Sequence, residues 1–385
     1  MGVFLNMTDF VYRKSESFSK IKTTKDSNLT DIFDELKRNL SSKDKLNDKE
    51  SLILEAIEKI GIEDNSSKFI LQPHVKQEIL AIHTLDSLSE YIYHRYRYDT
   101  FPKNKIIDEY PPCVQIEPTS ICNLRCVFCF QTDSLLTNKK EGHAGQMNLD
   151  LFKNVVDQLH NNVQFVTLAS RGEPLIAKEI IPMLEYLAGK FLGLKLNTNA
   201  TFLDEKKSHA ILSADVNTIV FSVDSADPET YSKLRVNGNL EKVMSNIENF
   251  IKIKEKHYSG SRIITRVSGV SFNPLLQDFD ETSKIWSNIV DQVAFVNYNP
   301  WENSYLKEPN SVTEACSDLW RRCFVWWDGK VNPCDVDYRS FLSVGNVQEK
   351  SISDLWNGEG YRTLRSAHLN MLRKNLKPCS GCVVV

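Results

Sequence analysis

The chain has 385 residues, more than one hydrophobic core usually holds, and its 41% apolar and 25% charged residues are typical of a globular protein with two or three domains. A net charge of −3 without a dense basic block disfavours nucleic acid as the main partner, and no apolar run approaches the roughly 20 residues that span a bilayer. The first ten residues lack the charged and apolar regions of a signal peptide, so a cytoplasmic protein with no membrane partner is expected.

Residues 1–108 are predicted to form a helical N-terminal extension. Apolar residues recur at helical spacing in three segments, at residues 29–40, 49–61 and 75–97. No convincing strand is found before residue 113. Pro111 and Pro112 then end this region, because proline cannot continue a helix.

Residues 109–305 alternate between predicted strands and helices. The strands are expected at residues 113–118, 164–169, 194–199, 216–223, 261–272 and 290–300, and the helices between them at 148–160, 177–191, 204–214, 240–257 and 278–289. Six such units imply a parallel sheet, most simply an α/β fold with a partial (β/α)6 TIM-like barrel. Parallel barrels carry their chemistry at the carboxyl ends of the strands, so the loops that follow the strands are expected to form the site.

Nine cysteines form two groups on either side of a long cysteine-free stretch. The first group is Cys113, Cys122, Cys126 and Cys129, and the second is Cys316, Cys323, Cys334, Cys379 and Cys382. In a reducing compartment, clustered cysteines indicate metal ligation more often than disulfides.

The loop after the first predicted strand places Cys122, Cys126 and Cys129 in a Cys-x3-Cys-x2-Cys pattern. Three thiolates at this spacing can hold three corners of an iron-sulfur cube and leave the fourth iron open to a small molecule. A zinc loop with a distant fourth ligand is the alternative, and a disulfide is a weaker one in this compartment.

This loop resembles the CxxxCxxC signature of the radical S-adenosylmethionine (radical SAM) enzymes, in which an aromatic residue, here Phe128, precedes the last cysteine. The similarity covers residues 110–385. It implies a 4Fe-4S cluster on Cys122, Cys126 and Cys129 with S-adenosyl-L-methionine at the open iron. It also implies reductive cleavage of that cofactor to a 5'-deoxyadenosyl radical, hydrogen abstraction from a substrate, and a flavodoxin- or ferredoxin-type electron donor.

A second motif follows the second predicted strand. The segment SRGEPL resembles the family's GGEP motif, with Gly172, Glu173 and Pro174 in place and Arg171 in the position of the first glycine. In the family, the counterpart of Glu173 helps to hold the methionine ammonium group, to which a carboxylate makes strong hydrogen bonds. The alternative is a turn with a solvated acid.

The resemblance extends the cofactor-binding positions to the ends of later strands. These positions are Asn197, Asn199, Ser222, Asp224, Arg235 and Arg266. For the first four, the alternative is a polar strand end that only contacts solvent. For the two arginines, the alternative is a structural ion pair.

Residues 316–338, CSDLWRRCFVWWDGKVNPCDVDY, resemble the start of a SPASM or twitch domain, the auxiliary-cluster appendage of many radical SAM enzymes, and the whole domain is expected at residues 306–385. The matching positions are Cys316, Leu319, Trp320, Asp328, Gly329, Val331, Pro333 and Cys334. The segment WWDGKVNP also reads as a β-hairpin with an Asp-Gly turn, and a helix at 352–369 would return the chain to the closing pair.

The resemblance implies one auxiliary 4Fe-4S cluster on Cys316, Cys334, Cys379 and Cys382. A second auxiliary cluster is not expected, because Asp335 stands where many relatives have another cysteine. Zinc held by the same four thiolates is the alternative.

Two cysteines remain, Cys113 and Cys323. The default for each is a small buried hydrophobic residue. The sharper hypothesis is that one of the two thiols gives a hydrogen atom to a substrate radical, as epimerases of this family require. Cys323 is the better placed candidate for this catalytic role, because its hairpin is expected to face the barrel.

The resemblance thus implies a radical SAM oxidoreductase of the dehydrogenase type. The single auxiliary cluster and short C-terminus favour a small, carbohydrate-like substrate, such as a sugar, cyclitol or nucleotide sugar. Peptide-modifying relatives often carry a small leader-binding domain with three strands near the N-terminus, and no such strands are predicted here. An epimerase and a peptide or protein maturase are alternatives. A non-catalytic metal-binding scaffold is another, which the open three-cysteine loop disfavours.

Overall fold

The structure is a computed structural model that describes residues 11–13, 18–23, 29–60, 69, 71–82 and 84–385. The first ten residues, in which no signal peptide is expected, lie outside the described part. None of the described helices is both long enough and apolar enough to cross a membrane.

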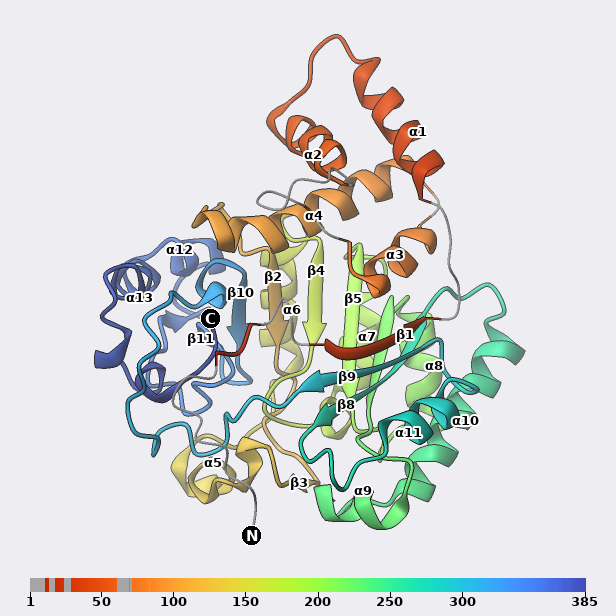
Figure 1. The fold of residues 1–385 in the computed structure, drawn as a ribbon, viewed down its shortest axis with the longest axis vertical. Coiled ribbons are helices and arrows are strands. Elements are labelled where there is room, and N and C mark those ends of the chain that lie inside the picture. The colour runs from red at the N-terminus through yellow and green to blue at the C-terminus, as the bar shows by residue number, and fades with distance from the viewer. Residues whose placement is uncertain (1–10, 14–17, 24–28, 61–68, 70, 83) are drawn as a thin grey trace.

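A ten-stranded sheet with the order β1-β9-β8-β6-β5-β4-β2-β10-β11-β12 organises the molecule (Figure 1). Its centre is six parallel strands, namely β2 (Cys113–Ile116), β4 (Phe165–Leu168), β5 (Gly193–Thr198), β6 (Thr218–Ser222), β8 (Ile264–Ser271) and β9 (Gln292–Asn297). These strands are the six that the sequence predicts. They confirm the α/β fold with the parallel sheet of a partial TIM-like barrel.

Helices follow the parallel strands, and all but the short one directly after the fourth strand cover the outer face of this sheet. That short helix lies at the carboxyl end of the strands (Figure 1). These helices are α6 (Leu149–Leu159), α7 (Ile180–Leu187), α8 (Glu205–Ser213), α9 (Pro228–Leu234), α10 (Leu240–His257) and α11 (Phe279–Trp286). Most begin at an Asn or Asp whose side chain accepts a backbone N–H of the first turn, such as Asn148 before α6 and Asp204 before α8. Their apolar faces and alternate strand residues form the main core.

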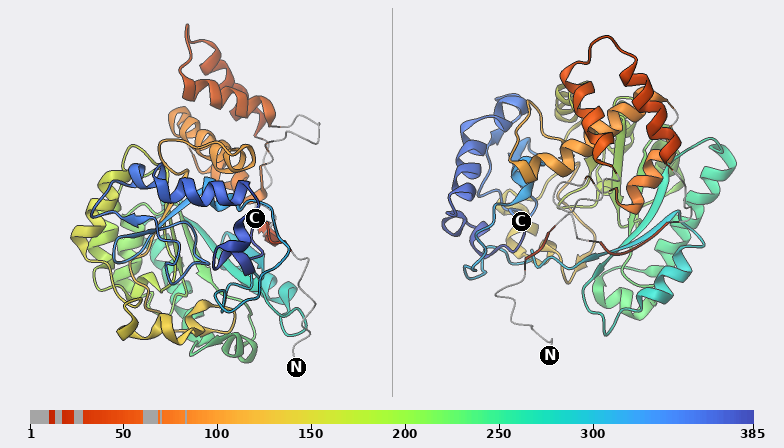
Figure 2. Two further views of the ribbon diagram at one scale, coloured as in Figure 1. Left: turned by 90° about the vertical axis from the view of Figure 1, so that its left-hand side faces the viewer. Right: turned by 45° about the horizontal axis from the view of Figure 1, so that its top comes forward.

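The N-terminal helices are α1 (Thr30–Ser41), α2 (Asp48–Lys59), α3 (Pro73–Leu80) and α4 (Leu85–Asn104). The first two form a hairpin that stands on α4, as both views of Figure 2 show. Helices α3 and α4 lie at the amino end of the barrel strands (Figure 1). There Gln292 at the start of β9 donates to Gln77 of α3 at 2.5 Å, so α3 closes the end of the barrel opposite to the expected site.

One strand contradicts the expectation that no strand precedes residue 113. Residues 18–23 form β1 (Phe18–Thr23), which pairs antiparallel with β9 at the edge of the sheet. Its partner follows it by more than 260 residues, so only long-range pairing reveals this strand. The other described elements before residue 113 are helical, as predicted.

At the opposite edge, the sheet continues into the C-terminal region. Strand β10 (Arg322–Val325) pairs in parallel with β2, and β11 (Lys330–Asn332) and β12 (Gly345–Asn346) follow antiparallel. Strands β10 and β11 form the predicted hairpin, whose turn holds Gly329 at a φ of +82°. The division of the chain at residues 108/109 and 305/306 stays a prediction.

The remaining elements, apart from one helix of 11 residues near the C-terminus, are short. They are β3 (Arg125–Cys126), β7 (Arg235–Val236), α5 (Ser134–Thr137), α12 (Ile352–Trp356), α13 (Glu359–Leu369) and the 3₁₀ turns η3 (Phe130–Thr132), η4 (Lys139–Glu141), η5 (Pro174–Ile176), η6 (Ser317–Trp320), η7 (Arg373–Asn375) and η8 (Cys379–Gly381). Most lie at the carboxyl ends of the barrel strands or in the C-terminal region, where the two cysteine groups are found.

Candidate active site at the carboxyl end of the barrel

The three-cysteine loop is held in place by a second, two-stranded sheet. Strand β3 pairs antiparallel with β7, which follows the fourth barrel strand, so Cys126 lies opposite Arg235. Cys126 and the ring of Phe128 are buried in a small cluster against which Cys122 and Cys129 pack. The structure therefore brings together all three cysteines, as the sequence predicts.

Polar groups surround these thiols. The backbone N–H of Leu124 lies 3.4 Å from Cys122 Sγ, the Asn199 amide nitrogen lies 3.9 Å from the same sulfur, and an Arg235 guanidinium nitrogen lies 3.8 Å from Cys126 Sγ. Hydrogen-bond donors aimed at sulfur stabilise thiolate ligands.

The donor set fits an iron-sulfur cluster. Burial raises the pKa of the Cys122 thiol to about 12, and it also raises the pKa values of Cys126 and Cys129. Thiolates in such a place need a bound cation, which iron supplies. Over the described part of the chain, no three His, Cys, Asp or Glu side chains are grouped closely enough to hold one metal ion. The thiolates of a cluster each bind a different iron and need not converge on one point.

The segment with the GEP motif packs directly on the cysteine loop. A Cβ on Gly172 would lie 2.3 Å from the Thr119 carbonyl oxygen and 2.6 Å from that of Ile121, so only glycine fits there. The backbone N–H of Glu173 donates to the Ile121 carbonyl at 2.9 Å. Pro174 begins η5.

Glu173 is buried and is already hydrogen-bonded by its own chain. Its carboxylate accepts from Leu175 N at 3.1 Å, Thr198 Oγ1 at 2.6 Å and Asn199 N at 2.7 Å. Together with its backbone hydrogen bond to Ile121, Glu173 thereby ties the end of β5 to the cysteine loop. An ionised carboxylate has about four acceptor positions, so one remains for an ammonium group. Its role toward the cofactor stays a prediction.

The other predicted positions at strand ends differ in their contacts. Asn199 donates to Asn123 Oδ1 at 2.9 Å beside Cys122. Asn197 Oδ1 is buried without a hydrogen-bond partner, as is the Ser170 hydroxyl at the end of β4, whereas Ser222 is half-buried at the end of β6. Because buried polar atoms are normally paired, the first two indicate a place for a bound polar molecule.

Asp224 and Arg235 form a buried ion pair, with Oδ2 and Nε 2.5 Å apart. Asp224 also accepts from Val270 N at 2.7 Å, and the Arg235 guanidinium lies 5.8 Å from the centre of the Phe128 ring. Both residues are therefore at the site, where they position the cysteine loop. Any contact of theirs with the cofactor stays a prediction.

Arg266 is not at this site, so the position predicted for it is wrong. It lies near the start of β8, where its guanidinium is 3.5 Å from Glu78 of α3 and donates to Gln292 Oε1 at 2.6 Å. These contacts are at the amino end of the barrel, and they match the alternative of a structural ion pair.

The second cysteine group surrounds one cavity in the C-terminal region. Cys316, Cys334, Cys379 and Cys382 line it together. Cys316 precedes η6, and Cys334 follows the hairpin. Cys379 begins η8 and Cys382 follows it, so distant segments converge as the sequence predicts. Burial raises the pKa of the Cys334 thiol well above its usual range, so this donor set also fits a bound metal centre.

Cys323 does not face the barrel interior, and that expectation is wrong. It is fully buried in the main core, on the same side of the sheet as its partner Val114. Successive residues of a strand point to opposite faces of the sheet. Position 323 of β10 points to the outer face, where the thiol contacts Tyr361 and the helices. Burial raises its pKa to about 12. Cys323 therefore matches the other expectation, that it is a small buried hydrophobic residue.

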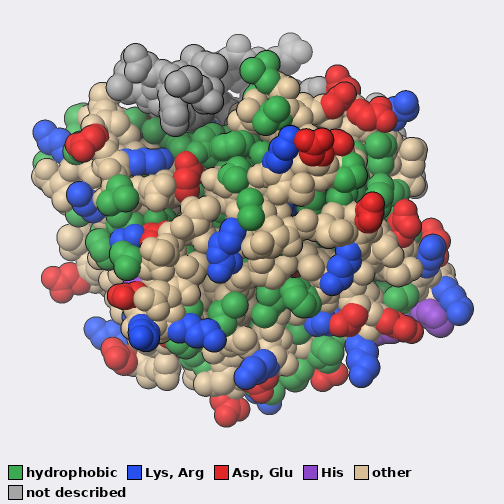
Figure 3. All heavy atoms as spheres, turned by 90° about the horizontal axis from the view of Figure 1, so that it is seen from below, with side chains coloured by type: hydrophobic (Ala, Val, Ile, Leu, Met, Phe, Trp, Pro, Cys, Tyr) green, Lys and Arg blue, Asp and Glu red, His purple; other side chains and the backbone are tan. Residues whose placement is uncertain are grey.

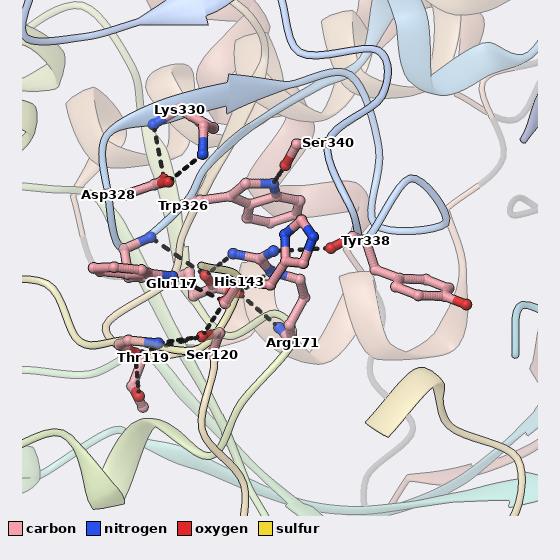
Figure 4. Close-up of polar contacts among 12 residues, drawn as sticks. Glu117, Thr119, Ser120, His143, Arg171, Trp326, Asp328, Lys330, Tyr338 and Ser340 are labelled. Carbon is pink, nitrogen blue, oxygen red and sulfur yellow. Dashed lines mark hydrogen bonds and ion pairs between the residues drawn. The ribbon is translucent and has the colours of Figure 1, made fainter. Parts of the chain in front are cut away.

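Sequence reasoning missed a buried polar network around Arg171 (Figure 4). Besides Glu117 at the end of β2, its guanidinium contacts the Tyr338 carbonyl at 2.8 Å and lies 4.3 Å from the Trp326 ring. Arg171 therefore joins the barrel to the C-terminal region. The one sequence signal was an arginine in the first glycine position of the motif.

Trp301 was also missed. Its indole N–H donates to the Phe128 carbonyl at 2.8 Å, and its ring packs on Phe130. It also packs in the cluster that contains Cys334 and Cys382, so it touches the surroundings of both cysteine groups. Nothing in its local sequence, YNPWEN, signals this position.

The face at the carboxyl ends of the strands is shown in Figure 3. Acidic and basic side chains are interspersed over its described part. Val127 in the cysteine loop and Val236 in β7 are exposed apolar residues next to the candidate site.

Family models match two parts of the chain. The radical SAM superfamily model matches residues 116–270, and the SPASM iron-sulfur cluster-binding domain model matches residues 316–383. Together they cover more than half of the chain and include both cysteine groups.

Similar proteins support the same grouping. A tungsten-containing aldehyde ferredoxin oxidoreductase cofactor-modifying protein of Pyrococcus furiosus is 25% identical over 69% of this chain and 86% of its own. An AdoMet-dependent heme synthase of Methanosarcina barkeri is 23% identical over 71% and 91%. The crystal structure of Streptococcus suis SuiB bound to precursor peptide SuiA aligns with a TM-score of 0.50 and 15% identity over 85% of this chain and 86% of that one, which shows a shared fold. The chain therefore belongs to the radical SAM superfamily, with a SPASM domain and iron-sulfur clusters and S-adenosyl-L-methionine as cofactors.

Proposed function

We propose that this radical SAM enzyme oxidises a small polar substrate of the sugar, cyclitol or nucleotide-sugar class, with one auxiliary 4Fe-4S cluster as the electron acceptor. The observation that carries the proposal is the pairing of one open three-cysteine loop with a single four-cysteine cavity. A closed, fully thiolate-ligated cluster has no vacant iron and suits electron transfer.

When bound, the cofactors supply a primary-carbon radical that removes a hydrogen atom from an unactivated C–H bond. Loss of one further proton and one electron makes the product two hydrogens lighter than the substrate. The electron that starts the reaction comes from a flavodoxin- or ferredoxin-type donor.

The chain's own residues would bind and orient the reactants. Cys122, Cys126 and Cys129 would hold the first cluster. Glu173 would offer its remaining acceptor position to the methionine ammonium group. The unpartnered Asn197 oxygen and Ser170 hydroxyl would bond hydroxyl groups of the cofactor or substrate.

Two features favour a small substrate over a peptide. The one described strand before residue 113 belongs to the main sheet, and the described N-terminal helices α3 and α4 pack at the amino end of the barrel. A leader-binding domain with three strands of its own has no counterpart among these described elements. The likeness to SuiB concerns the fold and carries no argument about the substrate.

Oxidation is favoured over epimerisation by the position of Cys323. An epimerase needs a hydrogen donor that can reach the substrate radical, and this thiol is 0% exposed in the core behind the sheet. No other part of the proposal depends on Cys323.

Anaerobic incubation with candidate sugars deuterated at carbon tests the proposal. Deuterium should appear in 5'-deoxyadenosine, and mass spectrometry should find a product two hydrogens lighter. If no sugar transfers deuterium but a deuterated peptide does, the carbohydrate substrate is wrong and the enzyme is a peptide maturase.

A further inference from the structure

His368, on α13, is a buried residue beside the four-cysteine cavity. Its side chain is 2% exposed, and it lines the cavity together with Cys316, Cys334, Cys379 and Cys382. It belongs neither to the cysteine motif nor to the barrel.

The hydrogen bonding of His368 fixes which ring nitrogen carries the proton. The backbone N–H of Cys316 donates to Nδ1 at 3.2 Å. An imidazole nitrogen that accepts a hydrogen bond has no proton, so the ring is neutral and its proton is on Nε2.

That Nε2–H is a buried donor without a hydrogen-bond partner. Arg373 lines the same cavity, is 1% exposed, and also has a buried, unpartnered Nε. The rest of its guanidinium binds carbonyls around the cavity, including that of Cys382 at 2.8 Å. Buried N–H groups without a partner are rare in proteins, so an acceptor is expected in the cavity.

We propose that His368 Nε2–H donates a hydrogen bond to a sulfur atom of the auxiliary cluster and thereby raises its reduction potential. The inference rests on the assignment of that cluster to the four-cysteine cavity. His368 is therefore a residue that tunes the cluster and not a catalytic one. The hydrogen bond from Cys316 N–H orients its ring, and the proton on Nε2 is donated to a cluster sulfur.

The direction of the effect follows from charge. Reduction adds one negative charge to the cluster, so a donor to its sulfur stabilises the reduced form more than the oxidised form. Hydrogen bonds to the sulfurs are among the factors that set the potentials of such clusters.

The test uses the full chain with Cys122, Cys126 and Cys129 replaced by alanine, so that only the auxiliary cluster remains. Its potential is measured by redox titration followed by electron paramagnetic resonance. In His368→Phe, the ratio of reduced to oxidised cluster at a fixed potential should fall about tenfold, equal to a shift of about 59 mV to lower potential for one electron.

Two further variants separate tuning from mere packing. His368→Gln can place its amide N–H where Nε2 was, and it should retain most of the original potential. His368→Asn can keep the acceptor for the Cys316 N–H but does not reach the cluster, so it should behave like His368→Phe. His94→Phe alters another buried histidine, which stacks on Phe165 away from the cavity, and should leave the potential unchanged.

Three results would overturn the inference. They are an unchanged potential in His368→Phe, equal potentials in the Gln and Asn variants, or loss of four-iron loading in every His368 variant. Zinc in the cavity would overturn it as well. None of these readouts uses substrate, so a wrong substrate class leaves them unaffected.

Discussion

The guanidinium of Arg171 and the carboxylate of Glu117 form a two-pronged ion pair, with Nε–Oε2 at 2.8 Å and Nη2–Oε1 at 2.5 Å, and both side chains are at most 2% exposed. Glu117 also accepts from the backbone N–H of Trp327 at 3.3 Å. The pair therefore lies between the barrel and the C-terminal hairpin (Figure 4).

Removing one partner of this pair should strongly destabilise the protein. In Arg171→Ala, the Glu117 carboxylate would stay buried without its counter-charge, and the free energy of unfolding should fall by about 3–5 kcal/mol. Arg171→Lys should not restore it, because lysine cannot make the two-pronged contact. Urea denaturation of the apoprotein measures both.

The exposed pair Arg13–Glu314 provides the matched control. Arg13→Ala should change the free energy of unfolding by less than about 1 kcal/mol. Equal effects at the two sites would show that the Arg171 contact has no special structural role.

Iron content should reveal two clusters. Anaerobic reconstitution should give about eight irons per chain, as two 4Fe-4S clusters. Replacing Cys122, Cys126 and Cys129 by alanine should leave about four and abolish cleavage of S-adenosyl-L-methionine. Elemental analysis that finds zinc instead of iron in the remaining site would contradict the auxiliary cluster.

Glu173→Gln should weaken binding of S-adenosyl-L-methionine by roughly 1.5–3 kcal/mol, the range for a hydrogen bond to a charged group. Iron content should not change. Thr198→Val removes one donor to the same carboxylate and keeps its charge, so it should weaken binding less. Equal dissociation constants for wild type and Glu173→Gln, measured by calorimetry, would exclude the proposed contact.

Gly172→Ala should distort the cysteine loop. The added Cβ meets backbone oxygens of Thr119 and Ile121, which cannot move like a flexible side chain, and the expected cost is about 1–3 kcal/mol together with loss of the first cluster. Gly260 offers the control, because a Cβ there has nothing within 4 Å. Gly260→Ala should keep full iron content and stability within about 0.5 kcal/mol.

Cys323→Ala should retain product formation, because the thiol lies in the core and not at the reacting centre. The product should be two hydrogens lighter than the substrate, in proportion to the S-adenosyl-L-methionine consumed. A product of unchanged mass that gains one solvent deuterium at carbon and disappears in this variant would identify an epimerase instead.

Local chemistry made much of this molecule predictable. The six barrel strands have apolar patterns that are readable within single segments, and Cys122, Cys126 and Cys129 share one short loop. The four cysteines of the second group are farther apart in sequence, but their surrounding motif resembles a known domain. For the strands and the first loop the information lies in a short stretch of chain, and for the second group it lies in the resemblance of the surrounding motif.

The errors concern properties that only pairing between distant segments decides. Strand β1 depends on β9, and the side on which Cys323 lies depends on the register of β10 against β2. Arg266 is on a predicted strand, but its partner Glu78 comes from a helix almost 190 residues earlier. Periodicity gives no information about such partners.

The parallel pairing of β10 with β2 has a mechanical consequence. The strand that leads into the three-cysteine loop is hydrogen-bonded to the strand of the four-cysteine region, with Glu117 N donating to Val325 O at 2.9 Å. A swinging motion of the C-terminal region would have to break this ladder. The distance between the two cysteine sites is therefore fixed by main-chain hydrogen bonds. The distance over which an electron tunnels between them should stay constant through the catalytic cycle.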